Sequence, residues 1–440
     1  MYNTVIIRGG FAGCAAAIAA RKAGSEVVLL EKTDLLLGLG NVGGIMRNNG
    51  RYTATEENVA MGAGELFDIT DRCSLHTDVD FPGHRHASFF NIITVEPEVR
   101  RLLKKMDIET RMITRAVDVE ISMGNNESSN DDSTKPGTSI RSIRLANDDV
   151  IEGDVFVETT GSTGPMGNCA EHGHGCSMCV LRCPAFGPRV SISEKAGLPD
   201  LMGKRKDGRY GAFSGSGKLE KESLSRELQQ QLNESGVAVV PLPPEKIVRE
   251  KLDQKVCQQY ALDEYAENIV LIDTGHAKIM SPYFPLEPLR TIPGFENARY
   301  VDPYAGGKGN SIRYMSVAER DNTMRVKGFA NLFCGGEKSG LFVGHTEAVS
   351  TGSLAGHNAV RYLAGEELLE LPRETAIGDL IAYANEKIMT ENGLRNRYTF
   401  AGAEFFKRMQ DRSLYTTDKT EVKRRVENSG LLGIYNRKLT

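Results

Sequence analysis

The chain has 440 residues, enough for two or three domains, and its 40% hydrophobic and 25% charged residues are ordinary for a globular protein. With a net charge of −4 at pH 7, the chain has no positive electrostatic potential over its whole surface that would attract polyanions, so any nucleic-acid site must be a local basic patch. No apolar run approaches the roughly 18 residues of a membrane helix, and the N-terminus lacks the features of a signal peptide. We therefore expect a cytoplasmic location and no membrane partner.

A β-α-β unit opens the chain. A β-branched strand is expected at 4–7, an Ala-rich helix at 12–23 with Gly24 at its C-cap, and a buried parallel strand at 27–30. The Gly- and Asn-rich stretch 35–52 is too flexible for a core element and suits the wrapping of a ligand.

Later segments change in character. A charged helix and the strand "AVDVEIS" are expected within 97–123, then an exposed polar hairpin tip, then strands that end at Gly161. A charged helix is expected at 220–234 and a helical tail from 404 onward. The predicted fold class is α/β, a Rossmann-like FAD-binding domain of the glutathione-reductase type with an inserted α+β domain. Its predicted parts are 1–161 and 281–370 for the FAD-binding domain, 162–280 for the Cys-rich or substrate insert, and 371–440 for a C-terminal helical region.

The first turn carries an incomplete dinucleotide fingerprint. In G-x-G-x-x-G the first glycine allows a tight turn, the second lets the pyrophosphate approach the backbone, and the third lets helix and strand pack closely. Gly10 and Gly13 are present, but Arg8 stands at the first position. Glu31 ends the second strand, where an acidic residue would bind the ribose, and the helix that starts near Ala12 would direct its positive end at the pyrophosphate.

Two further segments support FAD as the dinucleotide. "VFVETTG" is a strand that runs into Thr160 and Gly161, and "NLFCGGE" precedes a helix whose N-terminus can face the flavin. The alternative is a nucleotide-free α/β domain with coincidental glycines. The residues expected to bind the cofactor are Gly10, Phe11, Ala12, Gly13, Glu31, Lys32, Gly43, Thr160, Gly161, Gly335, Gly336, Glu337, Gly344 and Thr346.

Three stretches, "IPGFENARYVDPYAG", "NLFCGGEKSGLFVGHTEAVSTGSLAGHNAVR" and "LPRETAIGDLIAY", resemble the GidA/TrmFO superfamily, as does "FVETTGS". The resemblance implies noncovalent FAD in an extended form. One branch of that superfamily modifies tRNA wobble uridines, and the other is the folate- and FAD-dependent tRNA uridine methyltransferase. Both carry a nucleophilic cysteine in the loop after the second strand, whereas residues 35–64 here contain none.

Four of the eight cysteines lie close together in "CAEHGHGCSMCVLRCP". Cys-x2-Cys-x3-Cys-Pro matches the end of a bacterial ferredoxin run, although that run's leading cysteine would fall at Gly173. The spacing favours a [4Fe–4S] cluster; the alternatives are zinc, a redox-active pair formed by Cys176 and Cys179, and inert packing. The expected metal ligands are Cys169, Cys176, Cys179 and Cys183.

The catalytic candidates are Cys176 and Cys179 together with His345 and Glu347, which stand at the start of the flavin-facing helix and are expected near the isoalloxazine. "PGHRHASF" contains His84, Arg85 and His86; we expect a solvated loop, with an anion contact as the alternative. Lys308 and Arg313 could clamp an anion. Cys14 and Cys334 are expected in the core.

The expected function is that of an FAD-dependent oxidoreductase acting on a small molecule or a redox partner protein, with electrons passing through the cluster. The first alternative is tRNA uridine modification, with RNA held by a basic tail; the second is a non-catalytic flavin electron carrier. A homo-oligomer is compatible with each of these functions. The basic residues of the tail are Lys407, Arg408, Arg412, Lys423, Arg424 and Arg425.

Overall fold

A computed structural model describes the chain except for residues 1, 123–137, 162–189, 214–216, 282–283 and 302–311. Its largest element is a seven-stranded sheet of order β6-β2-β1-β9-β8-β7, in which β18 also pairs with β9. The pairs among β6, β2, β1, β9 and β18 are parallel, and β7 and β8 add an antiparallel edge. The strands are β1 (Tyr2–Ile7), β2 (Val27–Leu30), β6 (Glu109–Arg111), β7 (Ala116–Ser122), β8 (Ser139–Leu145), β9 (Val150–Glu158) and β18 (Leu332–Cys334).

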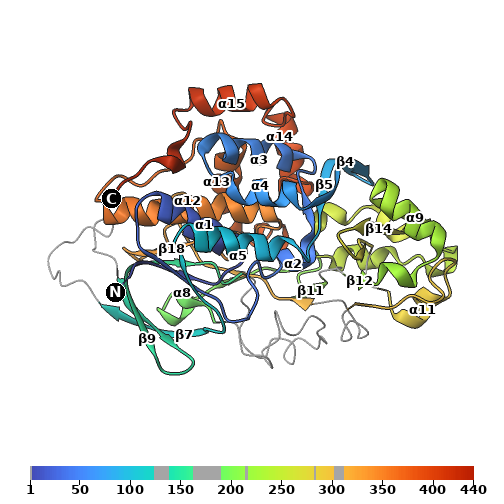
Figure 1. The fold of residues 1–440 in the computed structure, drawn as a ribbon, viewed down its shortest axis with the longest axis horizontal. Coiled ribbons are helices and arrows are strands. Elements are labelled where there is room, and N and C mark those ends of the chain that lie inside the picture. Colours follow the sequence, from blue (N-terminus) through green and yellow to red (C-terminus); the bar gives the residue numbers. More distant parts are fainter. Residues whose placement is uncertain (1, 123–137, 162–189, 214–216, 282–283, 302–311) are drawn as a thin grey trace.

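The central strands are buried along their carboxyl-terminal residues (4–7, 27–30, 155–158 and 332–334) because both faces of the sheet are covered there. Ile6 belongs to the core on the helical side, whereas Val5 and Ile7 belong to a second core on the other face. Helices α1 (Phe11–Lys22), α5 (Val95–Lys105) and α12 (His345–Leu363) lie on the first face (Figure 1). This arrangement is the α/β parallel sheet that the sequence predicts.

Helices α1 and α12 approach so closely that only glycine fits at their crossing. A Cβ on Gly352 would lie 2.2 Å from the backbone oxygen of Ala12, and a Cβ on Gly356 would lie 2.1 Å from that of Ala16. The small residues of both helices therefore serve packing, and they fix the start of each helix against the sheet.

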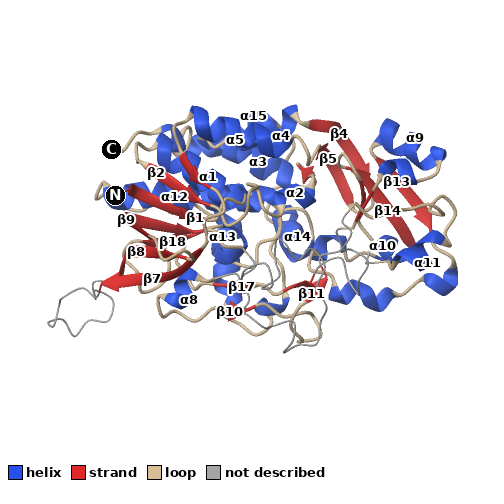
Figure 2. Ribbon diagram, turned by 60° about the horizontal axis from the view of Figure 1, so that its bottom comes forward, coloured by secondary structure: helices blue, strands red, loops and turns tan. Residues whose placement is uncertain are grey.

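A second unit lies at the end of the molecule away from both termini (Figure 2). It contains a four-stranded antiparallel sheet of order β12-β15-β14-β13 and a three-stranded sheet of order β3-β5-β4, which share one apolar core. Its strands are β3 (Ile45–Met46), β4 (Ser74–Phe81), β5 (His84–Phe90), β12 (Lys218–Leu219), β13 (Val237–Pro241), β14 (Asn268–Asp273) and β15 (Ala277–Ile279). Short helices and 3-10 turns cover it: α9 (Arg226–Ser235), α10 (Asp263–Glu267), α11 (Leu286–Arg290), η2 (Lys221–Ser223), η3 (Pro244–Lys246), η4 (Arg249–Gln254) and η5 (Gln258–Tyr260).

The second unit thus takes strands from residues 45–90 as well as from 217–280. The predicted domain boundaries remain predictions. The remaining described strands form two small antiparallel pairs. They are β10 (Leu201–Met202) with β17 (Ser316–Val317), and β11 (Ala212–Phe213) with β16 (Ile312–Arg313).

A layer of helices lies over α1 and α12, with α15 outermost above α3 (Figure 1). The remaining helices and turns are α2 (Gly40–Gly43), α3 (Gly50–Met61), α4 (Glu65–Arg72), α8 (Ile192–Lys195), η6 (Gly336–Ser339), α13 (Ala376–Ile388), η7 (Gly393–Arg395), α14 (Ala403–Asp411), α15 (Lys419–Asn428) and η8 (Ile434–Asn436). Within the described part of the chain, no helix is both long enough and apolar enough to cross a membrane.

Candidate functional site

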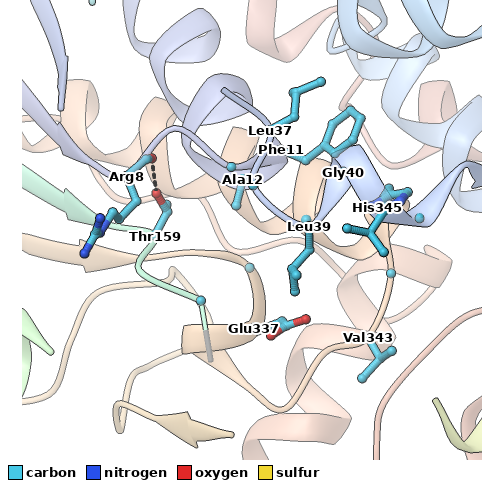
Figure 3. Close-up of a pocket in the computed structure, with 18 of the residues that line it drawn as sticks. Arg8, Phe11, Ala12, Leu37, Leu39, Gly40, Thr159, Glu337, Val343 and His345 are labelled. Carbon is cyan, nitrogen blue, oxygen red and sulfur yellow. Dashed lines mark hydrogen bonds between the residues drawn. The ribbon is translucent and has the colours of Figure 1, made fainter. Parts of the chain in front are cut away.

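A pocket opens at the carboxyl ends of β1, β2 and β9 (Figure 3). Its lining residues extend to the second unit. Ligands of open parallel sheets bind at this edge, where strand order changes direction. Of the predicted cofactor residues, the pocket is lined by Gly10, Phe11, Ala12, Glu31, Lys32, Gly43, Thr160, Gly161, Gly336, Glu337 and Gly344. Gly13, Gly335 and Thr346 are not among its lining residues.

Arg8 occupies the conformation for which the fingerprint uses glycine. Its φ is +89°, in the left-handed region that side chains rarely adopt. The Thr159 hydroxyl donates a 2.7 Å hydrogen bond to the Arg8 carbonyl, which fixes the turn to the end of β9 (Figure 3). The turn geometry of the fingerprint therefore survives the substitution, at the expense of backbone strain at Arg8.

Gly10 leaves the start of α1 open. A Cβ on Gly10 would meet nothing within 4 Å, and no side chain caps the helix. The first amide groups of α1 and the positive end of its dipole are therefore available to an anion. This matches what a pyrophosphate needs at the predicted position.

Glu31 is buried, and its carboxylate joins two strand ends. It accepts a 2.9 Å hydrogen bond from the Gly9 amide and bonds of 2.9 and 3.1 Å from the amide and hydroxyl of Thr33. Because a carboxylate offers about four acceptor positions, one remains for a ligand hydroxyl. The structure thus fits a ribose contact at Glu31.

The Gly- and Asn-rich stretch is better ordered than its composition predicts. It contains α2 and β3, and Leu36, Leu37 and Met46 are buried in the core. The expectation that it holds no core element is therefore wrong. Burial of its apolar side chains against α1 and α5 outweighs the flexibility of its glycines.

The same stretch nevertheless forms a wall of the pocket, as expected of a ligand-wrapping segment. The His345 ring approaches Gly43 so closely that a Cβ there would lie 1.7 Å from Nε2. It also packs on Phe11, with ring centroids 4.8 Å apart. Lys278 of β15 donates a hydrogen bond to the Gly43 carbonyl and so ties the loop to the second unit.

Glu347 is not a lining residue, although His345 is. Its carboxylate is fully buried and pairs with Arg51 at 3.1 Å. It also accepts hydrogen bonds from the Thr399 hydroxyl at 2.7 Å and the Phe400 amide at 2.9 Å. The structure thus gives Glu347 a structural position behind the pocket wall, where it holds Arg51.

Besides Ile45 of β3, four lining residues come from the second unit: Cys257, Gln259, Tyr260 and Lys278. Burial lowers the pKa of Lys278 to about 8 and raises that of Tyr260 to about 12. Arg51 lines the same end of the pocket. The sequence analysis missed Arg51 and these four residues because "CQQY" and the isolated cations match no motif and become neighbours only through the tertiary fold.

The expectation of a solvated loop at 84–86 is wrong for His84. Its ring is buried in β5, stacked on Phe81 with centroids 4.7 Å apart. Its Nε2 lies 3.1 Å from the Gln259 carbonyl, and its Nδ1 lies 2.9 Å from the Asn48 amide nitrogen. Burial lowers the pKa of His84 to about 3, so the ring is neutral and supports the η5 turn.

Below the pocket, a buried ionic cluster holds the ends of β9 and β18. Lys338 donates to the Ser191 hydroxyl at 2.6 Å and pairs with Asp200. Glu158 lies 3.8 Å from the Lys338 ammonium and accepts the Thr160 hydroxyl at 2.7 Å. The cluster therefore sets the position of Thr160 in the pocket wall.

The predicted metal ligands Cys169, Cys176, Cys179 and Cys183 lie outside the described residues, as does Lys308. Arg313 lies in β16. The described portion of the chain contains no group of three or more His, Cys, Asp or Glu placed to hold a metal ion. Cys14 and Cys334 are buried, as expected, and burial raises the pKa of both thiols.

The basic tail is less available to RNA than its composition predicts. Arg425 lies 3.6 Å from the buried Glu57, and Arg408 and Arg412 approach the buried Asp379 at 2.7 and 3.8 Å. The other three cations, Lys407, Lys423 and Arg424, are exposed. No lining residue of the pocket comes from beyond Ala348, so the tail and the pocket are separate.

Comparison with solved structures supports the fold. Aquifex aeolicus GidA, in two crystal forms, superposes with TM-scores of 0.62 and 0.60 at 16% identity; each covers 97% of this chain and, respectively, 76% and 78% of GidA. This likeness confirms the predicted fold class.

Curated relatives match over a short region only. The methylenetetrahydrofolate–tRNA-(uracil-5-)-methyltransferase TrmFO of Caldicellulosiruptor bescii is 38% identical over 94 residues, 21% of each chain. The TrmFO of Bacillus pumilus is 37% identical over 97 residues, 22% of each chain. The match thus spans about a fifth of the length of these relatives.

The family profile named Glucose inhibited division protein A matches residues 3–285 and 273–367, which is most of the chain. The predicted superfamily, with its FAD-dependent enzymes, is thereby confirmed. The chain belongs to the Glucose inhibited division protein A family.

Proposed function

We propose that this chain binds FAD in the pocket and uses it to modify a uridine of tRNA. Family membership and the TrmFO relatives favour this reaction over the oxidation or reduction of a small molecule. The observation that carries the proposal is one continuous pocket, which joins the β1–α1 turn to a polar end built by the second unit.

The residues present fit FAD. The open amides at Gly10 suit the pyrophosphate, Glu31 suits the adenosine ribose, and the N-terminus of α12 near His345 suits the electron-rich edge of the isoalloxazine. When bound, FAD supplies redox chemistry. This chain's own residues orient it and close the far end of the pocket.

Cys257 supports the proposed modification of RNA. The loop at 35–64 lacks the cysteine that the superfamily resemblance implies, but Cys257 brings a thiol to the same pocket from another element. Cys257 interacts electrostatically with the buried side chains of Lys255 and Lys278. Cationic neighbours of this kind surround cysteines that act as nucleophiles.

The test is an assay on tRNA with FAD-loaded protein, methylenetetrahydrofolate and a hydride donor, followed by nucleoside mass spectrometry. We expect a new uridine modification that Cys257→Ser abolishes while FAD content stays unchanged. Cys73→Ser is the matched control, since Cys73 is also half-buried but does not line the pocket. If the tRNA stays unmodified with each hydride donor and each one-carbon donor tested, the proposal is contradicted.

A second candidate is a flavin oxidoreductase for a small substrate, or an electron carrier. It is favoured by the separation of the basic tail from the pocket and by the engagement of Arg408 and Arg425 with buried carboxylates. Substrate-dependent reoxidation of the reduced flavin, without tRNA, would distinguish an oxidoreductase. The iron–sulfur cluster remains a prediction from the cysteine spacing, and metal and sulfide analysis of protein made without oxygen tests it.

A further inference from the structure

Residues 204–209, "KRKDGR", form a basic turn between β10 and β11. Four of these six side chains are cations and one is a carboxylate. The Arg205 amide donates a 2.8 Å hydrogen bond to the Arg209 carbonyl, and the Gly208 amide donates one of 3.0 Å to the Arg205 carbonyl. The turn therefore gathers its cations on a hydrogen-bonded backbone, as the local basic patch that a chain of net charge −4 needs for a polyanion.

A second segment adds a cation to this turn. The Lys204 amide donates to the Leu394 carbonyl at 2.8 Å, and the Arg397 side chain donates to the Lys204 carbonyl at 2.8 Å. Arg395 lies between them in the sequence, and its Nη2 would be 3.5 Å from a Cβ on Gly208. The cations of both segments that are at least partly exposed form one area, which we call the basic loop surface: Lys204, Lys206, Arg209 and Arg395.

Two carboxylates pair with four cations at the basic loop surface. Glu391 is shared by Lys204, at 2.9 Å, and Arg395, at 3.3 Å. Asp207 is shared by Arg209, at 2.7 Å, and the buried Arg205, at 3.4 Å. Because each carboxylate carries one charge, these pairs leave an excess of positive charge at the surface.

The ion pairs of the basic loop surface are exposed, in contrast to those of the tail. The side chains of Arg209 and Asp207 are 69% and 32% exposed. Since exposed pairs contribute little to stability, a phosphate oxygen can replace the carboxylate without disturbing the fold. Arg408 of the tail is held instead by Asp379, whose side chain is completely buried.

Gln258 connects the basic loop surface to the pocket. Its Nε2 donates to the Arg395 carbonyl at 2.9 Å, and its Oε1 accepts from the Arg397 amide at 3.0 Å. The two chain neighbours of Gln258, Cys257 and Gln259, both line the pocket. The basic loop surface therefore adjoins the end of the pocket that contains the proposed nucleophile.

We propose that the basic loop surface binds the phosphate backbone of tRNA and so brings a uridine to the second-unit end of the pocket. This inference rests on the proposed function, which makes tRNA the substrate. Lysine and arginine side chains that neutralise phosphates supply affinity and position the nucleic acid without reading its sequence. Both ribbon views place α15, on the basic tail, on the opposite side of the molecule from β11, which follows the turn (Figures 1 and 2).

The experiment measures the binding of fluorescently labelled, unmodified tRNA to the FAD-loaded full chain by anisotropy, at several salt concentrations. The turn variant carries Lys206→Glu and Arg209→Glu, both at exposed positions. The tail variant carries Lys423→Glu and Arg424→Glu, which make the same change of net charge at exposed positions of α15. FAD content and urea unfolding verify that both variants keep the fold, and Lys206→Gln with Arg209→Gln removes the two charges without reversing them.

We expect the turn variant to bind tRNA at least about tenfold more weakly than the native chain at a fixed salt concentration. Its log–log salt dependence should flatten by about one unit per lost phosphate contact. The glutamine variant should show a smaller loss in the same direction, and the tail variant should bind as the native chain does. In the modification assay the turn variant should raise KM for tRNA and leave kcat unchanged, because the surface binds tRNA away from the reacting atoms.

Equal affinities of the native chain and the turn variant, or equal losses in the turn and tail variants, would overturn this inference and leave the proposed function standing. Failure of the native, FAD-loaded chain to bind tRNA at all would overturn the proposed function itself, and this inference with it.

Discussion

The backbone carbonyl of Arg8 lies where a side chain on Gly13 would begin: a Cβ at Gly13 would be 1.8 Å from that oxygen. Because this neighbour is a backbone atom, it can move aside only if the β1–α1 turn or the helix shifts. The third glycine of the fingerprint is therefore required by the packing of α1 on β1, independently of any ligand.

This relationship predicts different outcomes at two glycines of one turn. Gly13→Ala should destabilise the fold by at least about 3 kcal/mol, because the helix must shift. Gly10→Ala should leave stability within about 1 kcal/mol, since its φ is −66° and the site is open, yet weaken FAD binding by filling the approach of the pyrophosphate. Urea unfolding and FAD titration measure the two effects. Equal stability of the two variants would contradict the packing argument.

Arg8 offers a test of backbone strain. Arg8→Ala and Arg8→Gly both remove the guanidinium, but only glycine relieves the φ of +89°. We expect Arg8→Gly to be more stable than Arg8→Ala by about 1 kcal/mol in urea unfolding. If alanine proves the more stable of the two, the turn does not keep this conformation in solution.

His84 should make stability depend on pH. Burial lowers its folded-state pKa from 6.5 to about 3, so the unfolded chain binds more protons between these values. Its contribution to stability is therefore fully present above pH 6.5 and is lost as pH falls toward 3. Between pH 7 and pH 5 the loss attributable to this ring is about 2 kcal/mol.

Replacing His84 with Gln should flatten that part of the pH profile, as measured by thermal or urea unfolding at several pH values. His86→Gln is the control, because His86 on the same strand is partly exposed and pairs with Asp78. A profile that is unchanged in His84→Gln would show that the ring is not buried as a neutral group.

The basic tail separates into structural and exposed cations. Glu57 accepts the amides of Ala376 and Ile377 at the start of α13 and lies beside Arg425; burial raises its pKa to about 7. Arg425→Glu should destabilise the chain by about 3 kcal/mol, because it leaves a buried carboxyl facing a like charge. Lys423→Glu and Arg424→Glu, on exposed positions of the same helix, should change stability by less than about 0.5 kcal/mol.

Lys423→Glu and Arg424→Glu are also the variants that test whether the tail binds RNA. If tRNA contacts the tail, Lys423→Glu with Arg424→Glu should weaken binding and flatten the salt dependence by about one unit of log–log slope per lost phosphate contact. Unchanged binding would place RNA on another surface. Arg425 is unsuitable for this test, since its loss disturbs the fold.

The sequence predicts the first β-α-β unit well because local signals determine it. The predicted helix at 12–23 is α1 (Phe11–Lys22), Gly24 has the positive φ expected after a helix, and the strand at 27–30 is β2. The polar end of the pocket could not be predicted in the same way. Cys257, Gln259 and Lys278 come from a turn and from strand β15, which reach Gly43 only through tertiary packing.

His84 is a residue that the sequence predicts to be exposed and that the structure buries. Its neighbours Pro82, Gly83 and Arg85 are typical of an exposed turn, and the turn is indeed at Pro82–Gly83. The ring is buried because Phe81 and Tyr260 enclose it, with centroids 4.7 and 4.6 Å away. Nothing in the local sequence encodes the contact with Tyr260.

The central claim is that the pocket holds FAD, and the most direct measurement is the identity of the cofactor released when the purified protein is denatured. The account predicts FAD and not FMN, at about one per chain after reconstitution. It also predicts weaker retention in Glu31→Ala, because Glu31 lines the pocket and is the residue proposed to bind the adenosine ribose, which FMN lacks. Release of FMN, or a colourless protein that FAD does not reconstitute, would contradict it.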